Sequence, residues 1–355
     1  FCKRICISKM IFVLLPFIKA TNNCMLSNAK IGIIGSGSWA TALAKILLTN
    51  AQSINWYFRN PDNIDFIKKY SLNPNYLGDV YFDTERIKFY NDINKIAKHS
   101  DILIFVIPSA FLKDGLKKLK VDISGKFVIS AIKGIVPDEN LIVGKFFNKA
   151  YGVPFDSIGI IAGPCHAEEV ALERLSYLTI ACPDVKKARA FALLIESSFI
   201  KANISDGIYG TEYASVLKNI YAVAAGICHG LHYGDNFQAV LISNAIQEIK
   251  RFVDKVHPIS RDIKGSAYLG DLLVTAFSQF SRNRLFGTMV GKGYTVRSAQ
   301  FEMHMIAEGY YAVKCIKEIN EEYNVNMPIC DAVYNICYEN ISPAIEIRLL
   351  TKDLR

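Results

Sequence analysis

Residues 30–48, KIGIIGSGSWATALAKILL, constrain the fold of this chain more than any other stretch. The isoleucines at its start predict a short buried strand, and the apolar residues after position 40 recur at helical spacing. A turn with two glycines separates them. Strand, glycine turn and helix in this order are the context in which GxGxxA indicates a dinucleotide-binding unit. The alternative is a turn that only packs, as in α/β proteins that have lost their cofactor.

The residue types in this turn suit a pyrophosphate. Gly35 permits the turn, Gly37 lets backbone amides approach the phosphates, and Ala40 is small enough for close helix–strand packing. The helix N-terminus then offers free N–H groups and the positive end of its dipole.

The second predicted strand, residues 54–58, ends at Arg59. An acidic residue near this point would bind the ribose 2′-hydroxyl of NAD, whereas a guanidinium can pair with a 2′-phosphate. An arginine that stacks on the adenine is the alternative. We therefore predict NADP or NAD as cofactor, with a slight preference for NADP.

Strand and helix candidates alternate as far as residue 205. Residues 101–107 and 126–131 are almost entirely apolar, which is typical of strands buried on both faces of a parallel sheet. We predict an α/β fold with a Rossmann-type doubly wound sheet over residues 25–205, the dinucleotide-binding domain. Long helical stretches follow, and they predict an all-helical substrate and catalytic domain over residues 206–355.

Residues 1–24 contain an apolar run flanked by Lys and Arg and resemble a short signal peptide. Because the first predicted strand begins soon after Met25, we interpret them as translated upstream sequence; a targeting leader is the alternative. The run is too short to span a bilayer, so no stable membrane insertion is expected.

Charge and cysteine usage narrow the class of protein. The net charge of +8 is not concentrated in a basic run, which favours an anionic cofactor and substrate over nucleic acid. Nine scattered cysteines without a CxxC pair argue against a disulfide framework or zinc site and for a reducing compartment. We expect a cytoplasmic protein without a metal.

Three groups of polar residues in the second half are candidates for chemistry. Lys218 and Asn219 lie in an apolar helix, where burial would lower the pKa of a lysine toward that of an acid/base catalyst; a snorkelling surface lysine is the alternative. Asp271 and Thr275 share a helix face, so Asp271 could orient a lysine or cap the helix. The run 281–284, SRNR, suits a phosphate or is an exposed polar turn.

Lys133 follows the strand at 126–131, where its side chain would project toward the crevice. Taken alone, Lys133 would be interpreted as a solvated loop lysine.

The motifs together resemble a known family. In order they are GSGSWA at 35–40, AIKG at 131–134, AGP at 162–164, LKN at 217–219, GDL at 270–272, SRNR at 281–284, FGTMVGKG at 286–293 and AEG at 307–309. This set is similar to that of the bacterial-type NAD(P)-dependent glycerol-3-phosphate dehydrogenases, and it covers the chain from about residue 30 to its end.

The resemblance implies reversible hydride transfer between dihydroxyacetone phosphate and sn-glycerol 3-phosphate, for phospholipid synthesis, by a homodimer. It assigns catalysis to Lys218, with Lys133 and Asp271. The implied substrate-binding residues are Lys133, Gly163, Cys165, Lys218, Asn219, Asp271, Thr275, Ser281, Arg282 and Asn283. The implied cofactor-binding residues are Gly35, Gly37, Ser38, Trp39, Arg59, Lys133, Ala167, Arg282 and Glu308.

Five residues depart from the family pattern. Cys165 replaces a Ser or Thr, His166 replaces an aromatic residue, and residues 243–245 replace Thr-Arg-Gly. Two other functions stay open: a β-hydroxyacid dehydrogenase of similar architecture, and a redox sensor that binds a nucleotide without turnover.

Overall fold

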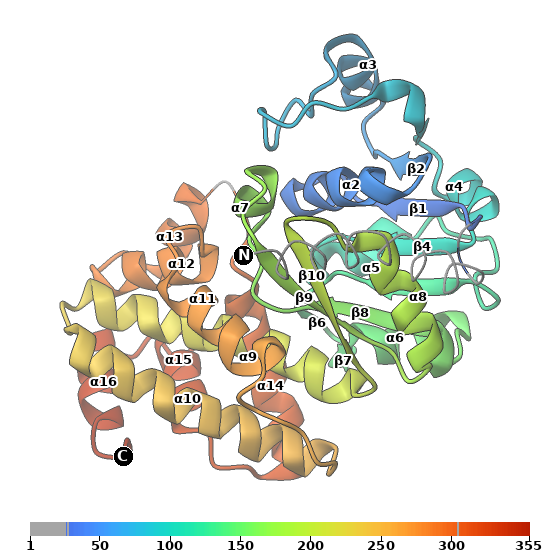
Figure 1. Ribbon diagram of the computed structural model, residues 1–355. Helices are drawn as coiled ribbons and strands as arrows, with labels where there is room; N and C mark the ends of the chain where they lie inside the picture. The colour runs from blue at the N-terminus through green and yellow to red at the C-terminus, as the bar shows by residue number, and fades with distance from the viewer. Residues whose placement is uncertain (1–25, 27, 304) are drawn as a thin grey trace, which may run out of the picture.

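The computed structural model describes residues 26, 28–303 and 305–355 (Figure 1). The leader predicted at residues 1–24 lies outside them. The first half forms an eight-stranded sheet in the order β10-β9-β8-β5-β4-β1-β2-β3. Its strands are β1 Ile31–Ile34, β2 Ile54–Tyr57, β3 Ile87–Tyr90, β4 Ile102–Phe105, β5 Phe127–Ser130, β8 Ile158–Ala162, β9 Ser176–Ala181 and β10 Ile200–Ser205.

Helices cover both faces of this sheet, so the central strands β1, β4, β5 and β8 are buried at every position. The helices and 3₁₀ turns of this half are α2 Ser38–Asn50, α3 Pro61–Tyr70, η1 Thr84–Arg86, α4 Ile93–His99, η2 Ser109–Phe111, α5 Leu112–Leu116, α6 Val143–Tyr151, η3 Phe155–Ser157, α7 Ala167–Ala171 and α8 Val185–Ile195. The predicted fold class is confirmed. One refinement is that β9 pairs antiparallel with β8, so β9 and β10 run against the other six strands.

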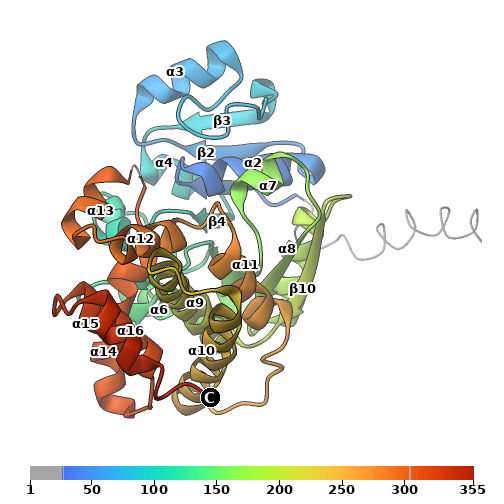
Figure 2. The same ribbon diagram turned by 90° about the vertical axis from the view of Figure 1, so that its left-hand side faces the viewer.

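The second half is helical and lies beside the sheet (Figure 1). Its elements are α9 Ile208–Gly230, α10 Asp235–Val256, the π-helical turn η4 Ser266–Gly270, α11 Asp271–Phe277, α12 Arg282–Gly291, α13 Val296–Glu302, α14 Glu308–Tyr323, α15 Pro328–Cys337 and α16 Pro343–Leu350. Helix α9 is buried on nearly every side because α10, α11, α12, α14 and α15 pack around it (Figure 2). A helix that is apolar all round belongs in such a place.

Helices α9 and α12 touch backbone to backbone. A Cβ added to Gly287 of α12 would lie 2.1 Å from the Val223 carbonyl oxygen, and one on Gly226 of α9 would lie 2.1 Å from the Arg284 carbonyl oxygen. No side chain fits in this seam. The contact holds α12 against the C-terminal part of α9, and both helices carry predicted site residues.

A short hairpin, β6 Ile135–Val136 and β7 Leu141–Ile142, was not predicted. Its residues Ile135 and Ile142 pack into the core of the helical half, while Ile208 of α9 packs into the core beneath the sheet. The two halves therefore interlock. None of the described helices is long and apolar enough to cross a membrane.

Candidate active site

The glycine turn lies between the carboxyl ends of β1 and β4. Strand β2 pairs with one side of β1 and β4 with the other, so the strand order reverses at this point, where doubly wound sheets bind their ligands. Gly35 has φ +137°, and a Cβ on it would lie 2.4 Å from the Val106 carbonyl oxygen, so only glycine fits. Among the residues that the structure describes, no atom lies within 4 Å of the Cβ position of Gly37, and no side chain caps α2, which begins at Ser38. The first N–H groups of α2 therefore have no side-chain acceptor within the described part of the chain.

Asn73, which the sequence analysis missed, holds this turn in place. Its buried side-chain amide donates to the Ser36 carbonyl oxygen at 3.1 Å and to Thr41 Oγ1 at 2.8 Å. Thr41 Oγ1 in turn donates to the Gly37 carbonyl oxygen at 2.9 Å. These bonds engage the turn's carbonyl groups and leave its N–H groups available to an anion. A lone asparagine in a loop carries no pattern that would reveal this role.

Two other residues predicted to bind the cofactor follow the glycine turn and β2. Trp39 is half-buried in the first turn of α2, and its Nε1 has no hydrogen-bond partner among the described residues. Arg59 is exposed two residues after β2 ends.

A buried lysine–aspartate pair forms the centre of the site. Lys218 Nζ of α9 donates to Asp271 Oδ1 at the start of α11, and both side chains are almost fully buried. Lys133 Nζ lies 3.6 Å from Asp271 Oδ2 and donates to the Gly163 carbonyl oxygen at 2.9 Å. The structure thus brings all three predicted catalytic side chains together around one carboxylate.

The pKa of Lys218 is lowered to about 7, first by burial and further by the charge of Lys133, against the opposing effect of Asp271. An ammonium group with this pKa can give up and recover a proton near neutral pH. That is the property required of an acid/base catalyst.

Two asparagines connect the neighbouring elements. Asn219 Nδ2 donates to the Lys133 carbonyl oxygen at 2.8 Å, and Asn283 Nδ2 donates to Asn219 Oδ1 at 2.9 Å. Asn283 Oδ1 accepts from the Gly309 N–H at 2.9 Å. Both asparagines were predicted to bind substrate; here their amides bond within the protein, and direct substrate contact stays a prediction.

The predicted phosphate-binding residues lie where α12 begins. Ser281 caps the helix by accepting from the Arg284 N–H, and Arg282 is exposed as the first helical residue. Thr275 Oγ1 donates to the Asp271 carbonyl oxygen at 2.6 Å, so it braces α11 rather than the Asp271 carboxylate.

The segment between β8 and α7 contains two of the departures from the family pattern. Burial raises the pKa of the Cys165 thiol to about 12, which keeps it protonated. The pKa of His166 is lowered to about 4 by burial and by the nearby lysines, so its ring is neutral. Gly163, with φ +105°, makes the turn at the end of β8, and Ala167 begins α7.

Glu308 begins α14 and reaches across to the end of β4. Its carboxylate accepts hydrogen bonds from the N–H and the hydroxyl of Ser109. The structure therefore places this predicted cofactor residue at the contact between the two halves. Ser109 was not predicted to take part in the site.

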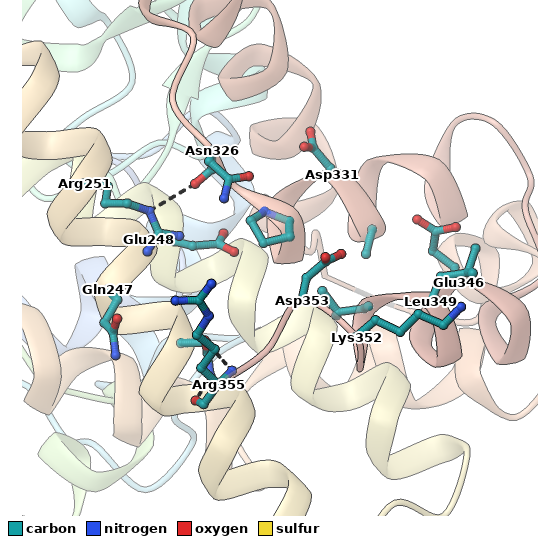
Figure 3. Close-up of a pocket in the computed structure, with 14 residues that line it drawn as sticks. Gln247, Glu248, Arg251, Asn326, Asp331, Glu346, Leu349, Lys352, Asp353 and Arg355 are labelled. Atoms are coloured by element: carbon teal, nitrogen blue, oxygen red, sulfur yellow. Dashed lines mark hydrogen bonds between the residues drawn. The ribbon is translucent and has the colours of Figure 1, made fainter.

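A polar hollow between α10, α15 and α16 shares no residue with this site (Figure 3). Its charges are mixed, with Arg251 and Lys352 facing the same space as Asp331 and Asp353. Its Glu248 accepts hydrogen bonds from the Ile329 and Cys330 N–H groups at the start of α15. Among the residues that the structure describes, no group of three His, Cys, Asp or Glu side chains is arranged to hold a metal ion.

Comparisons with known proteins identify a family that matches both halves of the chain. The family model described as the N-terminus of NAD-dependent glycerol-3-phosphate dehydrogenase matches residues 30–188, and the corresponding C-terminus model matches residues 207–348. A glycerol-3-phosphate dehydrogenase (NAD(P)+) of Staphylococcus epidermidis is 31% identical over 323 residues, covering 90% of this chain and 97% of the relative. One from Streptococcus mutans is 33% identical over 320 residues, covering 89% and 94%.

A solved structure is also similar over nearly its whole length. The crystal structure of glycerol-3-phosphate dehydrogenase from Coxiella burnetii superimposes with a TM-score of 0.85 at 26% identity, covering 92% of this chain and 99% of that one. The similarity therefore includes both the sheet and the helical half.

Proposed function

Because this chain belongs to the family of NAD(P)-dependent glycerol-3-phosphate dehydrogenases, we propose that it catalyses reversible hydride transfer between dihydroxyacetone phosphate and sn-glycerol 3-phosphate. The observation that carries the proposal is the buried pair of Lys218 and Asp271. A paired lysine of lowered pKa is what reduction of a ketone requires for proton transfer.

The cofactor site fits a dinucleotide. Within the described part of the chain, Gly37 has open space at its Cβ position, α2 has no side-chain cap and the indole N–H of Trp39 has no partner, and all three features suit an anionic nucleotide. NAD(P)H, when bound, supplies the hydride. Arg59 would lie at the adenosine end and favour NADP slightly over NAD.

The chain's own residues supply the proton and the orientation. Lys218 would hold the proton that neutralises the oxygen at C2 when a hydride adds to that carbon, and in oxidation it would accept the proton back. Asp271 orients both ammonium groups, since it lies between Lys218 and Lys133. Arg282, exposed at the start of α12, would bind the substrate phosphate.

The test measures oxidation of NADPH and NADH at 340 nm with dihydroxyacetone phosphate and the full chain. Turnover with the wild type and its loss in Lys218→Ala, while cofactor binding persists, are the expected results. The ratio of the two rates decides the cofactor preference. Near-normal kcat in Lys218→Ala would remove the proposed role of that residue.

Cofactor binding without turnover would instead favour the sensor function, and turnover of hydroxyacids alone would favour a β-hydroxyacid dehydrogenase. Family membership also supports a cytoplasmic homodimer that supplies phospholipid synthesis. Sedimentation of the purified chain tests the dimer.

A further inference from the structure

Ser109 makes a two-point contact with Glu308 across the two halves of the protein. Its N–H donates to Glu308 Oε1 at 3.0 Å, and its hydroxyl donates to Glu308 Oε2 at 2.5 Å. Ser109 is almost fully buried and lies just beyond the carboxyl end of β4. Glu308 is the first residue of α14. The two residues are 199 positions apart in the sequence, so the contact joins the sheet to the helical half.

The backbone after Lys133 packs directly on this contact. A Cβ added to Gly134 would lie 2.3 Å from Ser109 Oγ and 2.6 Å from Glu308 Oε2. Ser109, Glu308 and Gly134 therefore occupy one tightly packed point. A shift of Glu308 would move the segment that carries Lys133.

A series of hydrogen bonds also connects the start of α14 to the segment that carries Lys133. Gly309, next to Glu308, donates to Asn283, which donates to Asn219, which donates to the Lys133 carbonyl oxygen. The contacts form a closed ring through the end of β4, the end of β5, α9, α12 and α14.

Three residues of this ring directly follow residues of the proposed site in the sequence. Asn219 follows Lys218, Asn283 follows Arg282, and Gly134 follows Lys133. The ring also passes the carboxyl end of β4, beside β1, where doubly wound sheets bind their ligands. A ring that only stabilised the fold would not need to run beside each of these groups.

The N–H and hydroxyl of Ser109 stabilise the charged form of the Glu308 carboxylate. Partial burial raises the pKa of its carboxyl group, and the two hydrogen bonds from Ser109 oppose that shift. Removing the Ser109 hydroxyl would leave one carboxylate oxygen without this donor and release α14 from one of its two ties to β4.

We propose that Ser109 is a positioning residue: by holding Glu308, it fixes α14 against β4 and keeps Lys133 aligned with Lys218 during hydride transfer. The inference rests on the proposed function and adds to it a residue that touches neither substrate nor reacting atoms.

The test is Ser109→Ala in the full chain, which removes the hydroxyl but keeps the backbone N–H. We expect kcat for reduction of dihydroxyacetone phosphate to fall roughly tenfold to a hundredfold, because small misplacements cost rates of this order. KM should change much less. The primary isotope effect with cofactor deuterated at the transferred position should rise as hydride transfer becomes slower. A purely structural role would lower the melting temperature without moving the isotope effect.

Ser298→Ala is the matched control, since that hydroxyl lies exposed in α13 and bonds to Thr295. Hydrogen exchange at the Gly309 amide gives a readout independent of turnover, and it should be faster in Ser109→Ala alone. Wild-type kcat and isotope effect in Ser109→Ala would overturn the proposal. If the wild type does not reduce dihydroxyacetone phosphate, the proposed function fails, and unchanged exchange at Gly309 would then overturn the Ser109 contact as a positioning device.

Discussion

Opposing effects act on the pKa of Lys218, and their balance sets the protonation state of its side chain. Burial and the charge of Lys133 both favour the neutral amine, whereas Asp271 favours the ammonium form. Neither effect alone would leave a pKa of about 7. The carboxylate thus has two tasks, to orient the lysine and to keep it protonated near neutral pH.

This balance predicts a pH dependence. Reduction needs the protonated lysine, so its kcat/KM should be constant below pH 7 and fall above it; oxidation needs the neutral amine and should show the reverse. Asp271→Asn removes the charge that raises the pKa, so the falling limb of the reduction profile should move to lower pH. Asp235→Asn, an exposed change in the first turn of α10, serves as control. A limb that stays in place in Asp271→Asn would contradict this account.

Sequence reasoning singled out Lys218 and Asp271, which the structure pairs, but it did not single out Asn73 or Ser109, for a physical reason. An ionisable residue inside an apolar helix is costly, so the sequence itself signals a use for it. An asparagine or serine in a loop costs nothing and looks like any other turn residue. Their roles depend on which distant segments they meet, and no local pattern records that.

At the scale of elements, the backbone seam between α9 and α12 fixes the site's geometry. Gly287→Ala should destabilise the protein by at least about 2 kcal/mol, because its Cβ would meet backbone, which cannot move aside as a side chain can. Activity per folded molecule should fall too, since α12 carries Arg282. Denaturant unfolding and kcat measure the two effects.

Gly234→Ala is the matched control for this seam. Gly234 precedes α10 with extended backbone, and among the residues that the structure describes no atom lies within 4 Å of its Cβ position. Because Gly234 is the N-cap of α10 and alanine is a poorer N-cap than glycine, its replacement should cost up to about 1 kcal/mol, less than Gly287→Ala. Equal losses in the two variants would show that the close approach of α9 and α12 is not what the glycines provide.

The elements that sequence patterns predicted are those long enough to show a period. The strands predicted at residues 54–58, 101–107 and 126–131 correspond to β2, β4 and β5 within a few residues, and the long helical stretches predicted after residue 205 include α9, α10 and α14. Strands β6 and β7 have two residues each, so they display no alternation. The antiparallel course of β9 was also not predicted, since a buried strand reads the same in either direction.

At the scale of the whole molecule, the hairpin β6–β7 connects the two predicted domains, because its residues pack into the core of the helical half. A boundary at residues 205 and 206 does separate the last strand from the first long helix. Yet Ile135 and Ile142 contribute to the core of the helical half, and Glu212 of α9 accepts hydrogen bonds from the Gly144 N–H in the sheet half. Ile208 of the helical half in turn packs into a core beneath the sheet, so each half contributes to a core of the other, and we infer that they unfold together.

This inference can be tested with probes in different places. Both tryptophans, Trp39 and Trp56, lie in the sheet half, so their fluorescence reports on that half, whereas circular dichroism at 222 nm is dominated by the helices of the other. The two thermal transitions should coincide. With NADPH at 100 times its Kd, both should shift upward together, because the folded state then gains about 2.7 kcal/mol. The cofactor turn belongs to the sheet half alone, so a shift seen only by fluorescence, or two separate midpoints without cofactor, would mean that the halves are independent folding units.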